Sequence, residues 1–474
     1  MIEKALLKLH CFSFLYFCGM KARNILILLA GLLTLPLYFG GCAVDRWEAY
    51  AERTQTDRWI DDTMRVWYYW KQDIPHTNDL NYFAPPFEFF ASVLSEQDGK
   101  GGQPFSTIDS LESATRGVAS TGYGYGFQYT TNHVEDNDTA LYARLLYVSP
   151  DSPAGEAGLE RGDWIMELDG KPITEDNAAR LNGGDGLTLT VGYYDTARDT
   201  IVAYAEPLAL APSRNYLDNP VHYRNVYVSG SKRVGYLVYN HFTGGLTESS
   251  TEYDDDLREA FRYFASEQVN EFVLDLRYNN GGQLSCASLL CAMLAPSSAL
   301  GQPLGYLEFN ADRGEQELLM DENQIQGGAN LNLSRLYVLT STETASASEM
   351  VINSLKPYME VVLIGGTTVG KNVASQAFVN EELMLVMRPI VCKLYNARHE
   401  SDYADGFPAD VAVDENSDMA RFLPFGNPDE LMLHTALDLI NGNGSLPETQ
   451  GRAQKKTTVV YNSVRRKASK AVEM

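Results

Sequence analysis

The chain has 474 residues, of which 45% are hydrophobic and 21% are charged, and its formal net charge is −24. This is a globular composition with enough apolar material for the cores of two or three domains. The acidic balance repels a phosphate polymer, so it disfavours nucleic acid as a partner.

The stretch "MKARNILILLAGLLTLPLYFGGC", which begins at Met20, has a basic start, an apolar run and small residues before Cys42. These are the parts of a secretory signal, and the small residues before the cysteine resemble a bacterial lipobox. Phe39 departs from the lipobox pattern. An uncleaved membrane anchor is the alternative, but the run is short and contains Pro36. We therefore predict a leader over residues 1–42, export to the cell envelope (periplasmic or surface) and lipidation of Cys42 as a membrane anchor.

Residues 43–118 mix aromatic side chains with charge, and Trp59, Met64 and Trp67 lie near helical spacing. The stretch "PPFEFFASVL" predicts a second, shorter helix. Because no pattern typical of chemistry occurs here, we predict a small N-terminal helical domain whose role is packing.

Residues 119–207 change to short strand patterns and resemble a PDZ domain. Gly124-Tyr125-Gly126-Phe127 occupies the place of that family's carboxylate-binding loop. Glycines let successive backbone N–H groups converge on a carboxylate, and the next strand edge can add an extended peptide. A tight turn without a ligand is the alternative interpretation. The motifs that carry the resemblance are Ser152-Pro153-Ala154, Ala157-Gly158-Leu159, Gly162-Asp163-Trp164-Ile165 and Asp169-Gly170.

Residues 208–445 alternate strand and helix patterns, which predicts an α/β core. A local concentration of basic residues follows the break "NGNGS". Residues 446–474 are therefore predicted to be a basic flexible tail, with contact to an anionic surface as the alternative. The predicted strands of the core are at 233–242, 271–282, 335–341 and 360–366, and its helices are at 281–296, 346–359 and 428–440.

Ser346 stands between a predicted strand and a predicted helix, and with Glu349 it forms the S-x-x-E pattern of a capping box. This purely structural role is compatible with catalysis, because free backbone N–H groups at a helix N-terminus can stabilise an oxyanion.

The segment "TASASE", followed by the lysine of "TVGK", resembles the catalytic core of the S41 peptidases, the C-terminal processing or tail-specific protease family. "LDLRYNNGG" resembles the D-L-R-x-N-x-G-G segment of the same family. The order of helical region, PDZ domain and core also agrees. The resemblance implies a multidomain α/β protein: a small N-terminal helical domain, a β-rich PDZ domain and a ClpP/crotonase-like S41 catalytic core.

Carried over to this sequence, the resemblance implies that Ser346 is the nucleophile and Lys371 its general base. A lysine accepts a proton only when neutral, and burial lowers its pKa from about 10.4 toward the working range. The alternatives are a solvated lysine and a nucleotide-binding loop, because Gly365, Gly370 and Lys371 satisfy most of G-x-x-x-x-G-K-[ST]. That pattern ends here in Asn372, where it requires a hydroxyl.

The expected oxyanion donors are the backbone amides of Ala347 and of Gly281 or Gly282. The family often carries a glutamine four residues beyond the lysine. Here that position is serine and Gln376 follows it, so Gln376 is the predicted third catalytic residue, with an altered triad as the alternative.

Other chemistries lack their patterns. The sequence contains no H-E-x-x-H pair, no G-x-S-x-G elbow and no zinc spacing of cysteines, so we predict no metal site and no cofactor. Ser229 and Lys232 form an S-x-x-K pair without the accompanying motifs of penicillin-binding proteins, which makes it a chance match.

The sequence therefore predicts an exported serine endopeptidase of S41 type that acts on polypeptides with accessible C-termini, recognised by the PDZ domain. The main alternative is a catalytically inactive PDZ scaffold that binds peptide ends. A nucleotidase that uses the loop before Lys371 is the third and least favoured hypothesis.

Overall fold

The fold is known from a computed structural model. The residues it describes are 47–111, 121–133, 141–247, 250–443, 458–467 and 472–473. The predicted leader and Cys42 lie outside these residues. Over the described ranges, no helix has the length and apolarity needed to cross a membrane. The chain divides into two compact units, namely residues 1–59 with 81–84 and residues 60–80 with 85–474.

The smaller unit contains the first turns of helix α3 (Trp47–Trp67). Aromatic and cationic side chains hold it together. The ring of Tyr50 packs edge-on against Phe83, with ring centroids 5.4 Å apart. The guanidinium of Arg53 lies 5.4 Å from the centroid of the same Phe83 ring.

The larger unit begins with the remaining turns of α3 and with α4 (Pro86–Ser92), which confirm the two helices predicted for this region. The region also contributes a strand. β1 (Thr107–Ser110) pairs antiparallel with β20 (Leu385–Arg388), which in turn pairs with β19 (Phe378–Asn380). Residues assigned to the helical region thus complete a sheet of the C-terminal half. Two short 3-10 helices precede α4, η1 (Lys71–Asp73) and η2 (Thr77–Asp79).

The predicted PDZ domain is built on a sheet with the strand order β23-β3-β4-β5-β7-β8, in which β23 (Thr458–Asn462) comes from the end of the chain. Its inward-facing side chains form one apolar cluster that includes Leu145, Ile165 and Leu189, all fully buried. The other elements here are β2 (Thr121–Gly124), β3 (Phe127–His133), β4 (Leu141–Val148), α6 (Pro153–Glu156), β5 (Trp164–Leu168), β6 (Lys171–Pro172), η3 (Ala178–Asn182), β7 (Leu187–Asp195), β8 (Thr200–Ala203), β9 (Leu208–Leu210) and β10 (Arg214–Leu217).

The half of the chain that the sequence predicts to be catalytic is centred on a six-stranded sheet with the order β11-β12-β13-β16-β17-β22. The first two strands are antiparallel and the others pair in parallel, as the predicted strand and helix alternation requires. Its strands are β11 (Val221–Ser229), β12 (Lys232–Tyr239), β13 (Glu271–Asp275), β16 (Arg335–Thr340), β17 (Glu360–Gly365) and β22 (Val411–Ala412).

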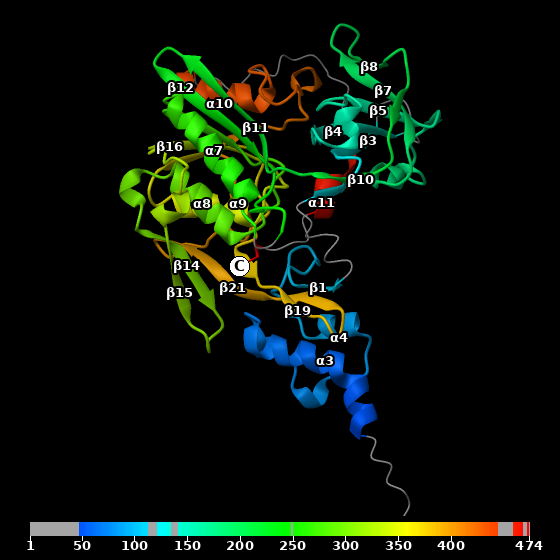
Figure 1. The fold of residues 1–474 in the computed structure, drawn as a ribbon, viewed down its shortest axis with the longest axis vertical. Helices are drawn as coiled ribbons and strands as arrows, with labels where there is room; N and C mark the ends of the chain where they lie inside the picture. The colour runs from blue at the N-terminus through cyan, green and yellow to red at the C-terminus, as the bar shows by residue number, and fades with distance from the viewer. Residues whose placement is uncertain are drawn as a thin grey trace, which may run out of the picture. The chain divides into compact units, whose positions relative to one another are not determined.

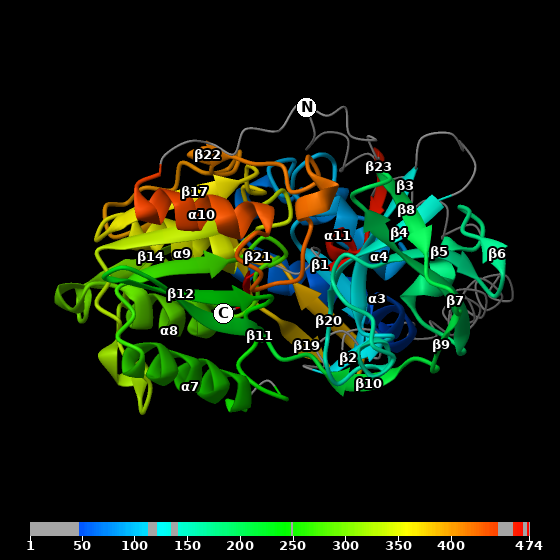
Figure 2. The same ribbon diagram turned by 90° about the horizontal axis from the view of Figure 1, so that it is seen from above.

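Helices cover both faces of this sheet (Figures 1 and 2). One apolar cluster joins the sheet to α7 (Glu252–Ser266), α8 (Leu284–Leu294) and α9 (Ala347–Leu355), and another joins its opposite face to α10 (Leu431–Asn441). Burial on both faces explains why the parallel strands read as continuous apolar runs. Three short 3-10 helices lie on the connections, η4 (Ser297–Ala299), η5 (Glu322–Ile325) and η6 (Met419–Arg421).

A second sheet lies beside the first and has the order β15-β14-β21-β18-β24. Its last member belongs to the stretch for which the basic composition predicts a flexible tail. The described elements of that stretch are β23 (Thr458–Asn462), α11 (Ser463–Lys467) and β24 (Val472–Glu473). The described part of that stretch instead forms paired strands, because strand formers such as Val459 and Val460 precede the basic residues. The other strands are β14 (Pro303–Phe309), β15 (Glu315–Leu319), β18 (Val373–Ser375) and β21 (Ile390–Asn396).

Candidate active site

Ser346 occupies the turn between β16 and α9, as the sequence predicts, and it is fully buried. Its backbone has φ +65° and ψ −115°, a conformation that L-residues rarely adopt. Strain of this kind costs about 1–3 kcal/mol and is found where function requires a fixed side-chain direction. The Ser346 hydroxyl faces the first turn of α9 but makes no hydrogen bond of standard geometry with any described residue. Among the described residues, its proton therefore has no acceptor.

Glu349 completes the predicted capping box and also does more. Its Oε2 accepts a hydrogen bond from the backbone N–H of Ser346 at 2.9 Å and another from the backbone N–H of Lys371 at 2.8 Å. Its Oε1 accepts from the N–H of Gly370 at 2.6 Å and from the hydroxyl of Thr368. One buried carboxylate thus joins the turn that carries Ser346 to the loop that carries Lys371.

Lys371 follows β17 and is 3% exposed. Its ammonium nitrogen lies 4.9 Å from the ring centroid of Phe105. Burial lowers the pKa of Lys371 to about 8, while the negative charges of Asp98 and Glu349 act in the opposite direction. The solvated-lysine alternative is therefore wrong, and near neutral pH a far larger fraction of such amines is neutral than of ordinary lysines.

The loop before Lys371 does not offer a nucleotide phosphate its usual partners. The N–H groups of Gly370 and Lys371, which a phosphate-binding loop would point at its ligand, are bonded to Glu349. The side chain of Asn372 donates to the backbone carbonyl of Ser401 at 2.9 Å. This geometry disfavours the nucleotidase hypothesis.

Two of the predicted oxyanion donors, Gly281 and Ala347, lie next to the serine. A Cβ placed on Gly281 would come within 2.7 Å of the Cβ of Ser346 and 3.0 Å of the backbone nitrogen of Ala347. The N–H of Gly281 already donates to Oδ1 of Asn279 at 2.8 Å. Ala347 is the first residue of α9, where a backbone N–H has no acceptor within the helix. Of the two glycines named from the sequence, Gly282 is thus the one whose amide stays a candidate.

Gln376 comes directly after β18, and its backbone N–H donates to the carbonyl of Pro389 at 3.3 Å. The pairing of β18 with β21 shifts register between Ala374 and Ser375, which marks a local irregularity at the position of the expected glutamine. The fully buried Ser375 stands at the family's glutamine position. The role of Gln376 stays a prediction.

The predicted carboxylate-binding loop joins β2 to β3. Gly124 and Gly126 adopt φ values of +145° and +89°, which explains the requirement for glycine at both positions. The side chains of Tyr125 and Phe127 are buried in the PDZ core. Any contact of these two residues with a peptide carboxylate therefore has to come from the backbone.

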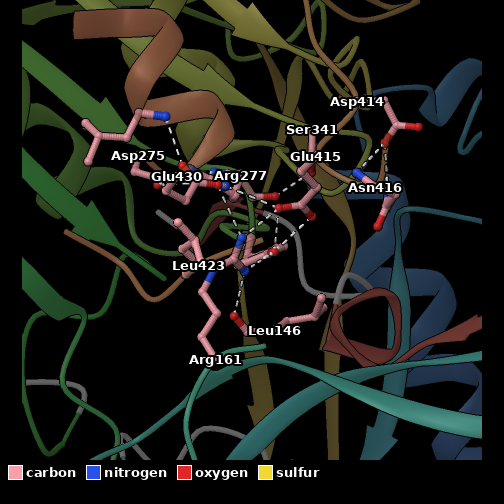
Figure 3. Close-up of polar contacts among 12 residues, drawn as sticks. Leu146, Arg161, Asp275, Arg277, Ser341, Asp414, Glu415, Asn416, Leu423 and Glu430 are labelled. Atoms are coloured by element: carbon pink, nitrogen blue, oxygen red, sulfur yellow. Dashed lines mark hydrogen bonds and ion pairs between the residues drawn. The ribbon is translucent and has the colours of Figure 1, made fainter. Parts of the chain in front are cut away.

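Sequence patterns did not predict a buried charge network that connects the PDZ domain to the catalytic half (Figure 3). Arg161, which follows α6, donates to the carbonyl of Leu146 at 2.8 Å within the PDZ domain and to that of Leu423 at 3.0 Å in the other half. It also forms an ion pair with Glu415 at 3.1 Å.

Arg277 of the "LDLRYNNGG" segment is the second centre of this network (Figure 3). It pairs with Asp275 at 2.9 Å, Glu415 at 3.2 Å and Glu430 at 2.7 Å. Burial acts to raise the pKa of Glu415, but the surrounding arginines outweigh it and lower that pKa to about 2. The motif arginine thus has a structural role beneath the loop that carries Gly281.

The remaining predicted features concern metals and thiols. In the part of the chain that the structure describes, no group of three His, Cys, Asp or Glu side chains is arranged to hold a metal ion. Cys286, Cys291 and Cys392 are buried and form no disulfide with one another, so each packs as a small apolar residue.

Family profiles match three stretches of the chain: a peptidase S41 N-terminal domain at residues 55–107, a PDZ domain at 145–182 and peptidase family S41 at 233–412. Among curated proteins, the carboxyl-terminal-processing protease of Picosynechococcus is 25% identical over 348 residues, which cover 72% of this chain and 74% of that protein. The chloroplastic carboxyl-terminal-processing peptidase 2 of Arabidopsis thaliana is 25% identical over 353 residues, covering 69% of this chain and 61% of the relative.

Among solved structures, an S41 protease candidate from Bacteroides fragilis is 43% identical to this chain and matches it with a TM-score of 0.76. The match covers 82% of this chain and 98% of the other. The order of a helical N-terminal region, a PDZ domain and an α/β core is the one that the sequence predicts. This chain belongs to peptidase family S41 and is a serine-type peptidase with a PDZ domain.

Proposed function

We propose that this chain is an exported endopeptidase that cleaves polypeptides with Ser346 as nucleophile and Lys371 as general base. One observation carries the proposal: the backbone N–H groups of Ser346 and Lys371 both donate to the same oxygen of Glu349. The loops of Ser346 and Lys371 therefore adjoin. Ser346 has a strained backbone and a hydroxyl without an acceptor among the described residues, and Lys371 has a buried amine whose pKa is lowered. A nucleophile and its base require these properties.

In the first half of the reaction, the neutral amine of Lys371 takes the proton of the Ser346 hydroxyl as Oγ attacks the substrate carbonyl. The tetrahedral oxyanion is stabilised by the N–H groups of Ala347 and Gly282. The lysine ammonium then gives its proton to the departing amine, so that the peptide bond breaks and an acyl-serine forms. Water, deprotonated by the same amine, hydrolyses the ester and restores Ser346.

The Ser346 hydroxyl makes no hydrogen bond to Lys371 in the described state. Catalytic hydrogen bonds often tighten only when substrate is bound, so this does not oppose the assignment. We assign Gln376 to orientation of Lys371 in the substrate complex. Under this proposal, a Gln376→Ala change lowers kcat and leaves binding of the substrate unaffected.

The PDZ domain is proposed to bind the free C-terminus of the substrate, with the backbone of residues 124–127 around the carboxylate and the edge of β3 pairing with the preceding residues. Export and lipid anchoring through Cys42 are proposed from the leader sequence. They are tested by expressing the full chain and Cys42→Ser in bacteria. Lipidated protein partitions into the detergent phase, and the Cys42→Ser protein should not.

The decisive experiment compares Ser346→Ala and Lys371→Ala with the wild-type full chain on an unfolded protein such as reduced, carboxymethylated casein. Ser229→Ala and Lys232→Ala serve as matched controls, because they remove the chance S-x-x-K pair. We expect only the first two variants to lose cleavage. Unchanged cleavage in either one rejects the dyad, and binding of peptide C-termini without cleavage by any of the proteins favours the inactive scaffold.

A further inference from the structure

Two described pieces of the chain's end, residues 458–467 and 472–473, are called the C-terminal segment here. Its strand β23 pairs antiparallel with β3 of the PDZ domain, with Thr458 opposite His133 and Asn462 opposite Thr130. Its strand β24 pairs in parallel with β18, with Val472 opposite Ala374. The segment thus pairs with one strand of each half of the enzyme.

The edge of β3 that β23 occupies is the edge that a PDZ ligand needs. β3 has two edges, and β4 is hydrogen-bonded to one of them, so an added peptide strand has to take the other. Successive residues of β23 run toward the start of β3, where the loop containing Gly126 lies. A peptide that presents its carboxylate to this loop would run in the same direction along the same edge.

Buried contacts hold the segment at this edge. The hydroxyl of Ser463 accepts from the backbone N–H of Tyr129 at 2.8 Å and donates to Oε1 of Gln128 at 2.8 Å. The ring centroid of Tyr461 lies 5.7 Å from that of Tyr129. Val464 is only 1% exposed and packs in a cluster of apolar side chains from both halves. Apolar burial of this kind contributes about 1.5–3 kcal/mol for a whole side chain.

The same segment contacts the loops that form the candidate active site. Arg465 donates to Oε1 of Glu343 at 2.7 Å, and Glu343 lies three residues before Ser346. Asn280, next to Gly281, donates to the backbone carbonyl of Glu343 at 2.7 Å. At the other end, β18 begins two residues after Lys371. The segment therefore contacts Glu343, which precedes Ser346 and is itself bonded to Asn280, and it pairs with the strand that follows Lys371.

We infer that the C-terminal segment is an intramolecular ligand of the enzyme's own peptide-binding edges, which competes with substrate C-termini for β3 and lies beside the catalytic residues until it is displaced. The inference rests on the proposed binding of substrates to the PDZ domain. The ion pair of Arg465 with Glu343 contributes little to the attachment of the segment, because the Arg465 side chain is 67% exposed. Val464 and the β3 pairing carry the attachment.

The test uses a labelled synthetic peptide with the sequence of residues 458–474, measured by fluorescence anisotropy. All proteins carry Ser346→Ala so that the probe is not cleaved. A chain ending at residue 457 should bind the peptide at least tenfold more tightly than the full chain. Equal affinity of the two proteins, or no binding to the truncated chain, overturns the inference. Because no cleavage is measured, failure of the proposed protease activity cannot be mistaken for failure of the inference.

A point variant repeats the test in the full chain. Val464→Asp should release the segment and raise affinity for the probe, whereas Val460→Asp, at a position that is 45% exposed, should not. A cooperative thermal transition in each protein shows that both are folded, and equal affinity of the two folded variants counts against the inference.

With Ser346 intact, the truncated chain should cleave unfolded casein about tenfold faster at low substrate concentration, and added peptide should inhibit it. If mass spectrometry shows that the wild-type chain removes its own residues 458–474 while Ser346→Ala keeps them, the segment is a substrate and the inference is wrong.

Discussion

The backbone N–H groups of Ser346 and Lys371 donate to the same carboxylate oxygen of Glu349, at 2.9 and 2.8 Å. Two residues that lie on different loops are thereby fixed relative to each other by one buried side chain. Under the proposed mechanism, this fixed position of Ser346 relative to Lys371 supplies part of the rate enhancement before any chemistry begins.

Replacement of Glu349 by glutamine tests this relationship. An amide keeps one acceptor oxygen but turns its NH2 group toward N–H donors, which leaves at least one backbone N–H unsatisfied at a cost of about 1–3 kcal/mol. We expect kcat for casein to fall by about 100-fold or more and thermal stability to decrease.

Glu360→Gln is the matched control, because Glu360 is exposed on β17 and pairs only with exposed Arg335 among the contacts described for it. It should leave kcat unchanged. A Glu349→Gln enzyme with normal kcat would show that the shared oxygen does not position the catalytic residues.

The pH dependence of cleavage should report Lys371. The base has to be neutral, and burial lowers the pKa of Lys371 to about 8, so kcat/KM should rise with pH and level off above about 8. Asp98 carries a negative charge that opposes this lowering. Asp98→Asn should therefore move the rising limb to lower pH.

The same shift affects stability in a defined direction. Because the folded pKa of Lys371 lies below the ordinary value of about 10.4, the unfolded chain binds more protons between these two values. The free energy of unfolding should thus increase through Lys371 as pH rises from about 8 to about 10, and Lys371→Met should lack this increase.

For cleavage, a rising limb of kcat/KM that stays at the same pH in Asp98→Asn would contradict the assignment of Lys371 as base.

How much of this site is visible in the sequence depends on the range of each contact. The S-x-x-E pattern predicts the cap of α9 because its two residues are three apart, and the apolar runs predict β16 and β17 for the same local reason. That Glu349 also reaches Gly370 and Lys371 depends on a loop 21 and 22 residues away folding back onto the helix start. No local pattern encodes that approach.

The charge network is hidden for the same reason. Arg277 is recognisable in its motif, but its partners Glu415 and Glu430 lie 138 and 153 residues further along the chain.

The end of the chain differs from its sequence-based prediction for another reason. Its basic composition predicts solvation, whereas residues 458–462 form a strand because strand formers such as Val459 and Val460 find a pairing partner in β3.

Gly281 offers a steric test of the oxyanion side of the site. An added Cβ would meet the Cβ of Ser346 at 2.7 Å, and the φ of +107° is strained for any other residue. Gly281→Ala should therefore displace Ser346 and reduce kcat/KM by about 100-fold or more. Gly301→Ala controls for backbone strain alone, since Gly301 has φ +77° and nothing within 4 Å of the added atom. Similar activity losses in the two variants would mean that strain, and not contact with the serine, is responsible.

The buried partner of Arg277 should matter far more to stability than an exposed one. Glu430 pairs with Arg277 at 2.7 Å, and both side chains are 1% exposed. Its Oε2 also accepts from the N–H of Leu433 at the start of α10, so the residue caps that helix as well. Glu430→Gln removes the negative charge opposite Arg277, and water cannot reach the buried guanidinium to compensate for the loss. Removal of one partner of such a buried pair lowers the free energy of unfolding by about 3–5 kcal/mol.

Glu360→Gln breaks the pair with Arg335, whose side chains are 56% and 43% exposed, and should cost less than about 1 kcal/mol. Urea unfolding of both variants, followed by tryptophan fluorescence, measures the difference. Because Arg277 also pairs with Asp275 and Glu415, part of its charge stays compensated in Glu430→Gln, which favours the lower end of the expected range. Equal effects of the two substitutions would show that the network beneath the Gly281 loop is solvated, and that Arg277 does not depend on Glu430 to stay buried.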